Sequence, residues 1–562
     1  MSTVDVLLQG AQVVDVNTRS IIFKEIGILN GAFTFDITKA KKVIHCDGLY
    51  IAPGLIDAHM HVESTMLPPS GFCNLAAPHG TTAVVLDPHE IANVLGILGI
   101  KRIMEDAKGL PLDCFFAASS CVPASPLETS GATLLADDLE PLFQDDRMVA
   151  LAEMMNFPGV IHEDPEVQKK IQMALRHGKK VDGHCPSLRG EALKKYVDAG
   201  ISSDHESTSA DEALEKLKLG MQLYIREGSA AKNLEALAPI ITPENAHQVC
   251  FCTDDRHPAD LRDEGHIDNI IRKAVTLGID PVLAICIASK HAADHYNLQS
   301  HGSIDEGKFA NFIVFDDLHN FEIKQTWHHG TLIAEAGEIL TPEISTTNWE
   351  SAKGSVHLPK NLDEATFSLQ ATADTIRVIE LIQGQLLTNE LRRTPLVKNE
   401  AYVADPSRDI LKMAVIERHH NTGNIGLGFV RGFAFSGGAI ASTVGHDAHN
   451  VAVIGDNDGD MALAAKTLAP DGGLCVVANG EVLAQLPLPI AGLMSDALGS
   501  EVIEQQRAVL HAVHSLGCPL EDPFMPLSFL PLSVIPKLKL SDLGLVDVEQ
   551  FAIVPLEVSD AR

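Results

Sequence analysis

The residues of this sequence best suited to chemistry are histidines and carboxylates at the ends of apolar runs. His59 and His61 form a His-x-His pair. Alternate residues of an extended strand share one face, so both imidazoles can reach one ion. Four further residues end later runs: Glu153, His184, His205 and Asp254. Four histidines and two carboxylates suit a pair of divalent cations, so the sequence predicts a binuclear metal centre for hydrolysis.

A repeated pattern positions these residues. From Tyr50 onward, apolar runs alternate with longer helical segments at a period of about 30 residues, which is typical of βα units. The runs are IAPGLIDAHMH, TTAVVLDPHE, DCFFAASSC, MVALAEMM, KKVDGHCP, GISSDHES, MQLYIREGS and VCFCTDD. Eight such units predict a (β/α)8 TIM barrel over residues 51–299, in which reactive groups lie at the C-terminal ends of the strands.

The flanking segments predict two further units. Residues 1–50 and 300–345 contain short alternating runs broken by glycine, and we expect them to pair into a small β-sandwich. Residues 345–375 are polar and indicate a linker, and residues 375–562 indicate a C-terminal α/β domain. The expected fold class is therefore α/β, with a metal-dependent barrel at its centre.

Charge and cysteine usage narrow the partners and the compartment. The formal net charge of −32 disfavours phosphate backbones and anionic lipid, so we expect neither nucleic acid nor membranes as partners. The N-terminus lacks a basic region followed by an apolar run, and no stretch is long enough for a membrane helix. Ten cysteines without a Cys-x-x-Cys pair indicate reduced thiols, and we expect a cytoplasmic protein.

Several motifs carry a family resemblance. The metal residues resemble those of the amidohydrolase superfamily, and HMHVEST, LDPHEIANV, VDGHCP and GHDAHN resemble its adenine deaminase family over nearly the whole chain. Many amidohydrolases bridge their two ions with a carboxylated lysine, whereas here Glu153 takes that place. The resemblance implies two divalent ions, manganese in the first instance with iron or zinc as alternatives, and a homo-oligomer, specifically a dimer.

The resemblance also implies a reaction. Adenine would be deaminated to hypoxanthine and ammonia by a metal-bound hydroxide, as in purine salvage. Asp254 would be both a ligand and the base that transfers the proton to the leaving amine. A second group must protonate the purine ring, and the choice stays open among four candidates near strand ends: Glu63, His89, Glu90 and Glu227.

The C-terminal motif GHDAHN is a separate question. His446, Asp447 and His449 could close over the barrel mouth, hold another metal, or cap a turn. Cys185 follows a predicted ligand, and we interpret it as a buried, inert thiol.

Other functions compete with deamination. An enzyme resembling N-acetylglucosamine-6-phosphate deacetylase also places a glutamate on the fourth strand, and a dihydroorotase-like cyclic amidohydrolase would usually require a lysine bridge. Outside the enzymes, the chain could resemble the dihydropyrimidinase-related scaffold proteins, which typically lose metal ligands. The complete set of six ligands favours a working metal centre.

Overall fold

Eight parallel strands form the centre of the molecule. The computed structural model describes residues 2–558. Each of the eight expected runs contains a strand: β8 (Leu55–Met60), β9 (Thr81–Leu86), β10 (Asp113–Ala118), β11 (Met148–Met154), β12 (Lys180–Gly183), β13 (Ser203–Asp204), β14 (Gln222–Arg226) and β15 (Val249–Cys252). Nearly all of their residues are buried, as expected for apolar runs in a parallel sheet covered on both faces.

The eight strands belong to two sheets, of order β12-β11-β10-β9-β8 and β13-β14-β15. Hydrogen bonds join the two sheets at both pairs of neighbouring edge strands. Ser202 N donates to Val181 O at 2.8 Å beside β12, and Asp254 N donates to His59 O at 3.1 Å beside β8. Because all eight strands run parallel, their C-terminal ends gather on one side, where the predicted reactive residues lie.

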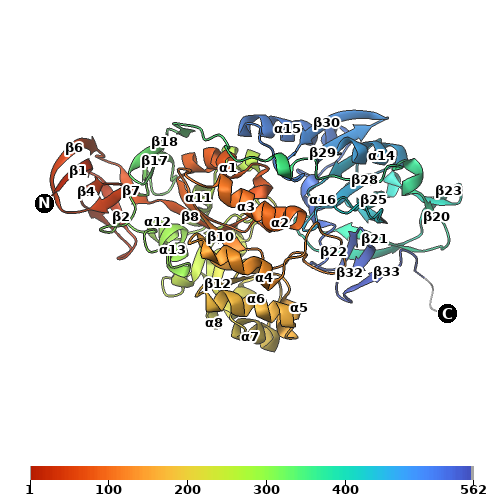
Figure 1. The fold of residues 1–562 in the computed structure, drawn as a ribbon, viewed down its shortest axis with the longest axis horizontal. Helices are drawn as coiled ribbons and strands as arrows, with labels where there is room; N and C mark the ends of the chain where they lie inside the picture. Colours follow the sequence, from red (N-terminus) through yellow and green to blue (C-terminus); the bar gives the residue numbers. More distant parts are fainter. Residues whose placement is uncertain (1, 559–562) are drawn as a thin grey trace.

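Helices cover the outside of these sheets (Figure 1). They are α1 (Pro69–Ala76), α2 (His89–Leu95), α3 (Ile97–Asp106), α6 (Pro165–Arg176), α7 (Gly190–Asp198), α8 (Ala210–Lys218), α11 (Ile267–Thr276) and α12 (Pro281–Cys286). Helix α11 shows the underlying pattern, because Ile267, Ile270, Ile271 and Ala274 recur at helical spacing and are all fully buried. The α/β character expected from the sequence is therefore present.

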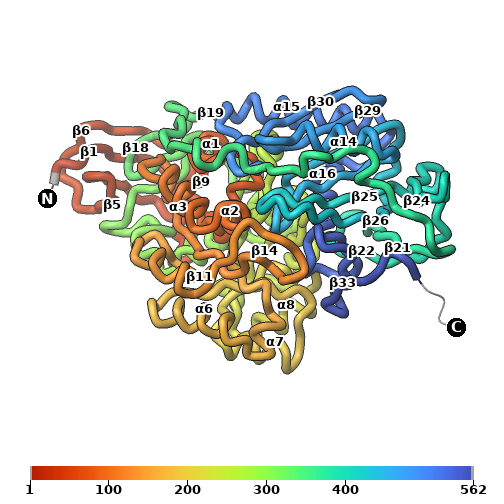
Figure 2. Tube along the Cα trace, turned by 45° about the vertical axis from the view of Figure 1, so that its right-hand side comes forward, coloured from red at the N-terminus to blue at the C-terminus, as the bar shows by residue number. Residues whose placement is uncertain are grey.

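Strands from the N-terminal segment and from the segment after β15 share a sheet, in which β7 pairs with both β2 and β16. One sheet has the order β19-β18-β17-β16-β7-β2-β3, and the other β5-β4-β1-β6. The strands are β1 (Ser2–Gln9), β2 (Gln12–Asp15), β3 (Ser20–Phe23), β4 (Ile26–Leu29), β5 (Ala32–Thr34), β6 (Ile37–His45), β7 (Tyr50–Pro53), β16 (Phe312–Phe315), β17 (Ile323–His328), β18 (Thr331–Glu335) and β19 (Glu338–Ile339). Both sheets lie at the end of the molecule that carries the N-terminus (Figure 2).

The prediction of a linker over residues 345–375 is wrong. Trp349 is 4% exposed, and Val356, Leu362 and Phe367 pack into one core with strands of the C-terminal region. The segment contains η7 (Glu350–Ala352), η8 (Glu364–Phe367) and β20 (Leu369–Gln370). Its average composition is polar, but a few apolar side chains pack into the core and hold the segment against the rest of the protein.

The C-terminal region is a largely antiparallel sheet of order β22-β21-β26-β25-β28-β27-β29-β30, in which only β21 and β26 pair in parallel among the described strands. These strands are β21 (Ile376–Leu381), β22 (Thr388–Arg393), β25 (Leu411–Ile416), β26 (Ile425–Arg431), β27 (Ala439–Ser442), β28 (Val451–Gly455), β29 (Gly473–Ala478) and β30 (Glu481–Pro487). Helices α14 (Asp458–Thr467), α15 (Gly499–Ser515) and α16 (Phe524–Phe529) pack on the sheet. Met66 and Leu67, which follow β8, share its core, so the two regions are packed together.

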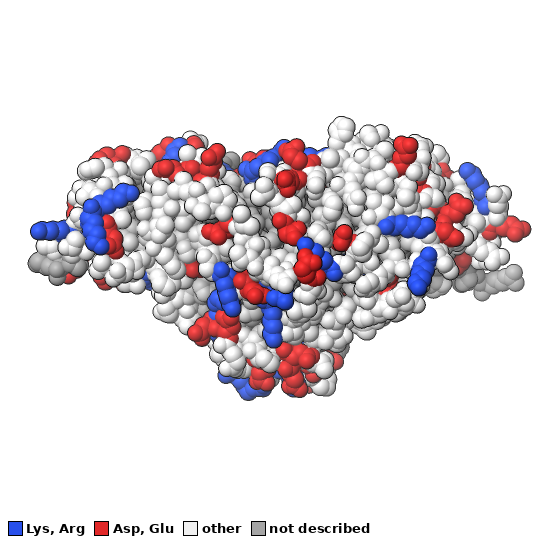
Figure 3. Space-filling view, turned by 45° about the horizontal axis from the view of Figure 1, so that its top comes forward, with Lys and Arg blue, Asp and Glu red and all other residues white. Residues whose placement is uncertain are grey.

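The surface shows no extensive basic face in the view of Figure 3, where acidic and basic side chains lie in small mixed groups. None of the helices formed by residues 2–558 is both long and apolar enough to cross a lipid bilayer.

The junction of β8 and β15 yields a stability prediction. Asp57 is fully buried, accepts hydrogen bonds from Thr253 N at 3.2 Å and Thr253 Oγ1 at 2.5 Å, and lies 3.0 Å from His266 Nε2. Asp57→Ala leaves these donors unpaired and should destabilise the fold by about 3 kcal/mol, measured as a lower thermal transition temperature. The exposed Asp47→Ala variant is the control and should cost at most about 0.5 kcal/mol. Equal transition temperatures for the two variants would contradict this role of Asp57.

Candidate active site

The carboxylate of Glu153 lies at the centre of the predicted ligand set. Its Oε2 is 2.7 Å from His184 Nδ1 and 3.1 Å from His205 Nε2. Its Oε1 faces the other side, 3.3 Å from His61 Nε2 and 4.0 Å from His59 Nε2. Each oxygen therefore lies beside a different pair of histidines. A carboxylate that bridges two cations would be placed in this way.

Asp254 completes one half of the group. It follows β15 after Thr253, and its φ of +58° places it in the left-handed region, where a short polar side chain is tolerated. Its Oδ1 lies 3.0 Å from His61 Nε2 and 3.6 Å from His59 Nε2. Its Oδ2 accepts a hydrogen bond of 2.7 Å from Arg226 Nη1, which fixes the carboxylate with Oδ1 toward the histidines.

The donor set fits a divalent transition metal. All six residues are at most 7% exposed, and His59 Nε2 has no hydrogen-bond partner among residues 2–558. His61 Nδ1 lies 3.0 Å from Asp87 O and donates to it, which leaves the lone pair of Nε2 free to bind a cation. Buried, unpaired imidazole nitrogens beside carboxylates are what such an ion requires.

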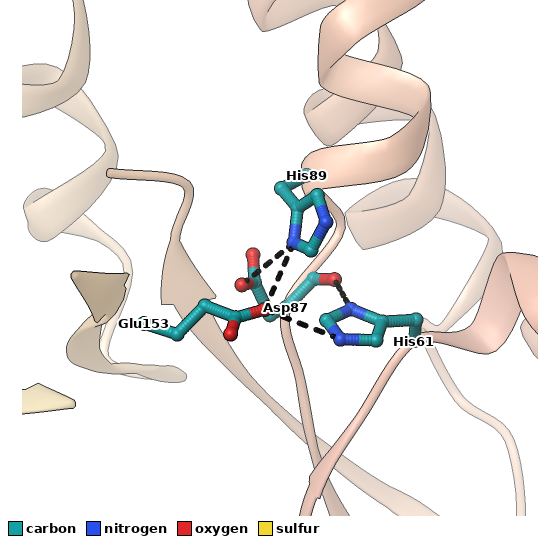
Figure 4. Close-up of side chains that lie close together, drawn as sticks. All are labelled: His61, Asp87, His89 and Glu153. Atoms are coloured by element: carbon teal, nitrogen blue, oxygen red, sulfur yellow. Dashed lines mark hydrogen bonds and ion pairs between the residues drawn. The ribbon is translucent and has the colours of Figure 1, made fainter. Parts of the chain in front are cut away.

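Asp87 belongs to the group and was not predicted from the sequence (Figure 4). His89 Nδ1 lies 3.0 Å from Asp87 Oδ2 and 3.5 Å from Glu153 Oε1, so His89 stands beside the centre. The sequence contained a signal for it, because Asp87 directly follows β9 and the predicted ligands also lie at or near the C-terminal ends of their strands.

Glu206 and Arg226 were also missed. Glu206 Oε1 lies 3.6 Å from both His184 Nδ1 and His205 Nε2, and the carboxylate forms a bidentate ion pair with Arg226. Glu206 follows a predicted ligand, and Arg226 ends β14, so their positions at strand ends could have identified them. Arg226 thereby holds Glu206 and Asp254 together.

The four candidates for proton transfer have different surroundings. Glu63 is buried and accepts a hydrogen bond from Ile91 N at 3.1 Å. Burial and the nearby carboxylate of Glu90 raise the pKa of Glu63 to about 7. His89 and Glu90 are also buried, with His89 Nε2 3.2 Å from Glu90 Oε1. Glu63, His89 and Glu90 are thus neighbours.

Glu227 lies elsewhere. Its carboxylate accepts a hydrogen bond from Leu234 N and pairs with Lys273 Nζ, both at 3.2 Å. Arg226, and not its neighbour Glu227, faces the metal-type residues.

The C-terminal motif contacts the start of α2. His446 Nδ1 lies 2.7 Å from Glu90 Oε1, and His449 Nε2 contacts Glu90 Oε2. His446, Asp447 and His449 are each at most 5% exposed. Of the three interpretations offered by the sequence, closure over the strand ends agrees with these contacts, and the residues also lie in a turn, in which His449 Nδ1 accepts a hydrogen bond from Gly445 N.

A cavity of about 1860 Å³ lies between the C-terminal ends of the parallel strands and the C-terminal region. Its lining includes Glu206 and Arg226 next to the histidines, Met155 and Asn156 after β11, and Met525 of α16. Glu206 and Arg226 therefore face both the cavity and the metal-type residues, which makes the cavity the candidate route for a substrate. Cys185, by contrast, is fully buried, and burial raises the pKa of its thiol well above the usual range.

Known proteins resemble this chain over its full length. The amidohydrolase family profile matches residues 50–333, and the profile of the adenine deaminase C-terminal domain matches residues 385–552. The adenine deaminase of Desulfatibacillum aliphaticivorans is 44% identical over 98% of this chain and 97% of its own length. Those of Nitratidesulfovibrio vulgaris strain DP4 and Methanothrix thermoacetophila are each 43% identical, over 99% and 98% of this chain and 97% of their own lengths. The chain belongs to the adenine deaminase family of the amidohydrolases.

Proposed function

We propose that the protein deaminates adenine hydrolytically to hypoxanthine and ammonia, a reaction of purine salvage. The observation that carries the proposal is the position of Glu153, whose two oxygens address separate pairs of histidines. The full-length relatives named adenine deaminase support the choice of adenine as the substrate. The complete ligand set argues against a metal-free scaffold.

Two divalent cations, with manganese proposed and iron or zinc as alternatives, would occupy this group. One would be held by His59, His61, Asp254 and Glu153 Oε1, and the other by His184, His205 and Glu153 Oε2. Bound cations of this kind supply Lewis-acid chemistry, which can lower the pKa of water from ~15.7 to about 7.

The protein's own groups would move the protons. Asp254 Oδ1 is proposed to take the proton of the attacking water and deliver it to the leaving amine. Arg226 holds Asp254 Oδ2 at 2.7 Å, so that oxygen is engaged and Oδ1 is the one that exchanges protons. The ring proton is proposed to come from the neighbours Glu63, His89 or Glu90. Glu227 is left out because its carboxylate pairs with Lys273.

Three further proposals concern the closure of the parallel strands, the other domains, and the compartment and oligomeric state of the protein. The strands β8 to β15 are proposed to close into a (β/α)8 barrel over residues 51–299, supported by the hydrogen bonds at both sheet junctions. Residues 1–50 with 300–345 would form the β-sandwich, and residues 375–562 the C-terminal domain. We also propose a cytoplasmic homodimer. All ten cysteines are buried and free, which fits a reducing compartment, and light scattering in solution tests the dimer.

The substrate is tested by product analysis. Manganese-loaded protein should release ammonia and hypoxanthine from adenine, and adenosine should be a much poorer substrate. N-acetylglucosamine 6-phosphate is the comparison for the alternative activity and should release no acetate. Acetate release without ammonia would overturn the proposal in favour of a deacetylase.

Glu153 is tested by metal content. Glu153→Gln removes the charge that faces both cation positions, so it should lose bound metal and reduce turnover by at least about 100-fold while retaining its far-ultraviolet circular dichroism. Reconstitution should proceed equally well without bicarbonate, because no lysine carbamate is involved. A strict bicarbonate requirement would contradict a glutamate bridge.

Asp254 and Asp255 form a matched pair. Asp254 faces His61, whereas Asp255 accepts a hydrogen bond from Ser64 Oγ and is only half-buried. Asp254→Asn should reduce kcat about 10²–10⁴-fold, the usual effect of removing a general base, and keep most of its metal. Asp255→Asn should lose much less activity. If Asp255→Asn proved the more damaging change, the assignment of the base would be wrong.

A further inference from the structure

A second group of metal-type residues lies where the C-terminal region meets the barrel. We call it the Glu90 cluster, and it consists of His89 and Glu90 at the start of α2 and His446, Asp447 and His449 between β27 and β28. All five residues are at most 5% exposed. Segments more than 350 positions apart in sequence therefore place two carboxylates and three imidazoles in one buried space.

The spacing of four atoms suits one cation. Glu90 Oε1 lies 2.7 Å from His446 Nδ1 and 3.2 Å from His89 Nε2. Asp447 Oδ1 lies 3.8 Å from His446 Nδ1 and 3.9 Å from His89 Nε2. Ligands held at about 2.1 Å in a tetrahedron are about 3.4 Å from one another, so these separations centre on the expected value.

Hydrogen bonding leaves the cluster unsatisfied. Apart from its imidazole contacts, the carboxylate of Glu90 has no hydrogen-bond donor among residues 2–558, and Asp447 Oδ2 has none. Buried polar groups are almost always paired, and a buried carboxylate without a partner is strongly unfavourable. A protonated His446 can neutralise Glu90, whereas the imidazoles of His446 and His89 lie 3.8 and 3.9 Å from Asp447 Oδ1, beyond hydrogen-bond distance, so one cation shared by both carboxylates would balance the cluster.

The surrounding bonds set the tautomers of two histidines. His89 Nδ1 lies 3.0 Å from Asp87 Oδ2 and donates to it, so the lone pair of His89 is on Nε2, facing the cluster. His449 Nδ1 accepts a hydrogen bond of 3.2 Å from Gly445 N, so its proton is on Nε2, facing Glu90 Oε2. His89 is therefore arranged as a ligand, and His449 as a donor that orients Glu90.

We propose that the Glu90 cluster binds a third divalent transition-metal ion, with His89 Nε2, Glu90 Oε1, His446 Nδ1 and Asp447 Oδ1 as ligands. Two imidazoles with two carboxylates favour a zinc-type ion over magnesium or calcium, which prefer oxygen ligands alone. The ion would join α2 of the barrel to the loop of the C-terminal region. With His89 Nε2 and Glu90 Oε1 bound to the ion, Glu63 is the one of the three proposed donors that would still supply the ring proton, whereas the number of bound ions is independent of the reaction.

Metal counting tests the proposal. Metal-free protein is reconstituted with Zn²⁺, freed of excess metal and analysed by elemental mass spectrometry. The unchanged protein should bind three ions per chain, and His446→Gln and Asp447→Asn should each bind two. His420→Gln is the matched control, because His420 also joins the two regions, by its contact of Nε2 with Ser130 O at 2.9 Å, and lies outside the cluster. It should bind three.

The outcomes separate this inference from the proposed function. If the unchanged protein and both variants bind the same number of ions, the third site does not exist, whether or not adenine is deaminated. Should a variant fail to fold, anomalous scattering at the zinc edge from crystals of the unchanged zinc-loaded protein decides the question. A peak among Glu90, His446 and Asp447 supports the site, and a map without that peak overturns it.

Discussion

The buried carboxylate of Glu153 is the constraint on which the rest of the site depends. At 3% exposure it would be very unfavourable alone, and its two oxygens face histidines from three other strands. A parallel sheet meets this requirement because every strand ends at the same side of the molecule. The chain can therefore bring side chains from positions 59 to 254 together at one side of the sheet.

In the proposed arrangement, several residues that do not bind a cation orient the side chains that do. Asp87 O orients His61, and Arg226 holds Asp254 while pairing with Glu206. Such contacts set tautomers and carboxylate orientation and therefore tune the affinity for metal. The guanidinium of Arg226 also offsets two buried negative charges beside the cation positions. The same contacts therefore balance the buried charges and orient the side chains of the site.

The sequence predicted the strands, and the residues that cluster at their ends, better than the contacts between those residues. Apolar runs ending in His, Glu or Asp pointed to His59, Glu153 and Asp254, which the structure brings together, because both features are local in sequence. Arg226 and Glu206 were missed because an ion pair across two strands leaves no local pattern. Glu227 was predicted to lie near the centre, but its neighbour Arg226 faces the centre instead. Alternation along β14 decides which of the two does so, and the sequence does not reveal its register. The segment 345–375 was misjudged because a few apolar anchors, such as Phe367, outweigh its polar average.

The C-terminal region and the parallel-strand region stabilise each other through a shared apolar core and through buried polar contacts. Glu90 is buried by residues of that region, and its neighbours His446 and His449 come from it. Separation of the two regions would expose the apolar core shared by Leu67 and the C-terminal strands, and would also remove the partners of Glu90. Apolar burial favours docking in any orientation that covers the surface, whereas the His–carboxylate contacts are satisfied in only one. The apolar core thus supplies the affinity between the regions, and the buried polar group determines their register.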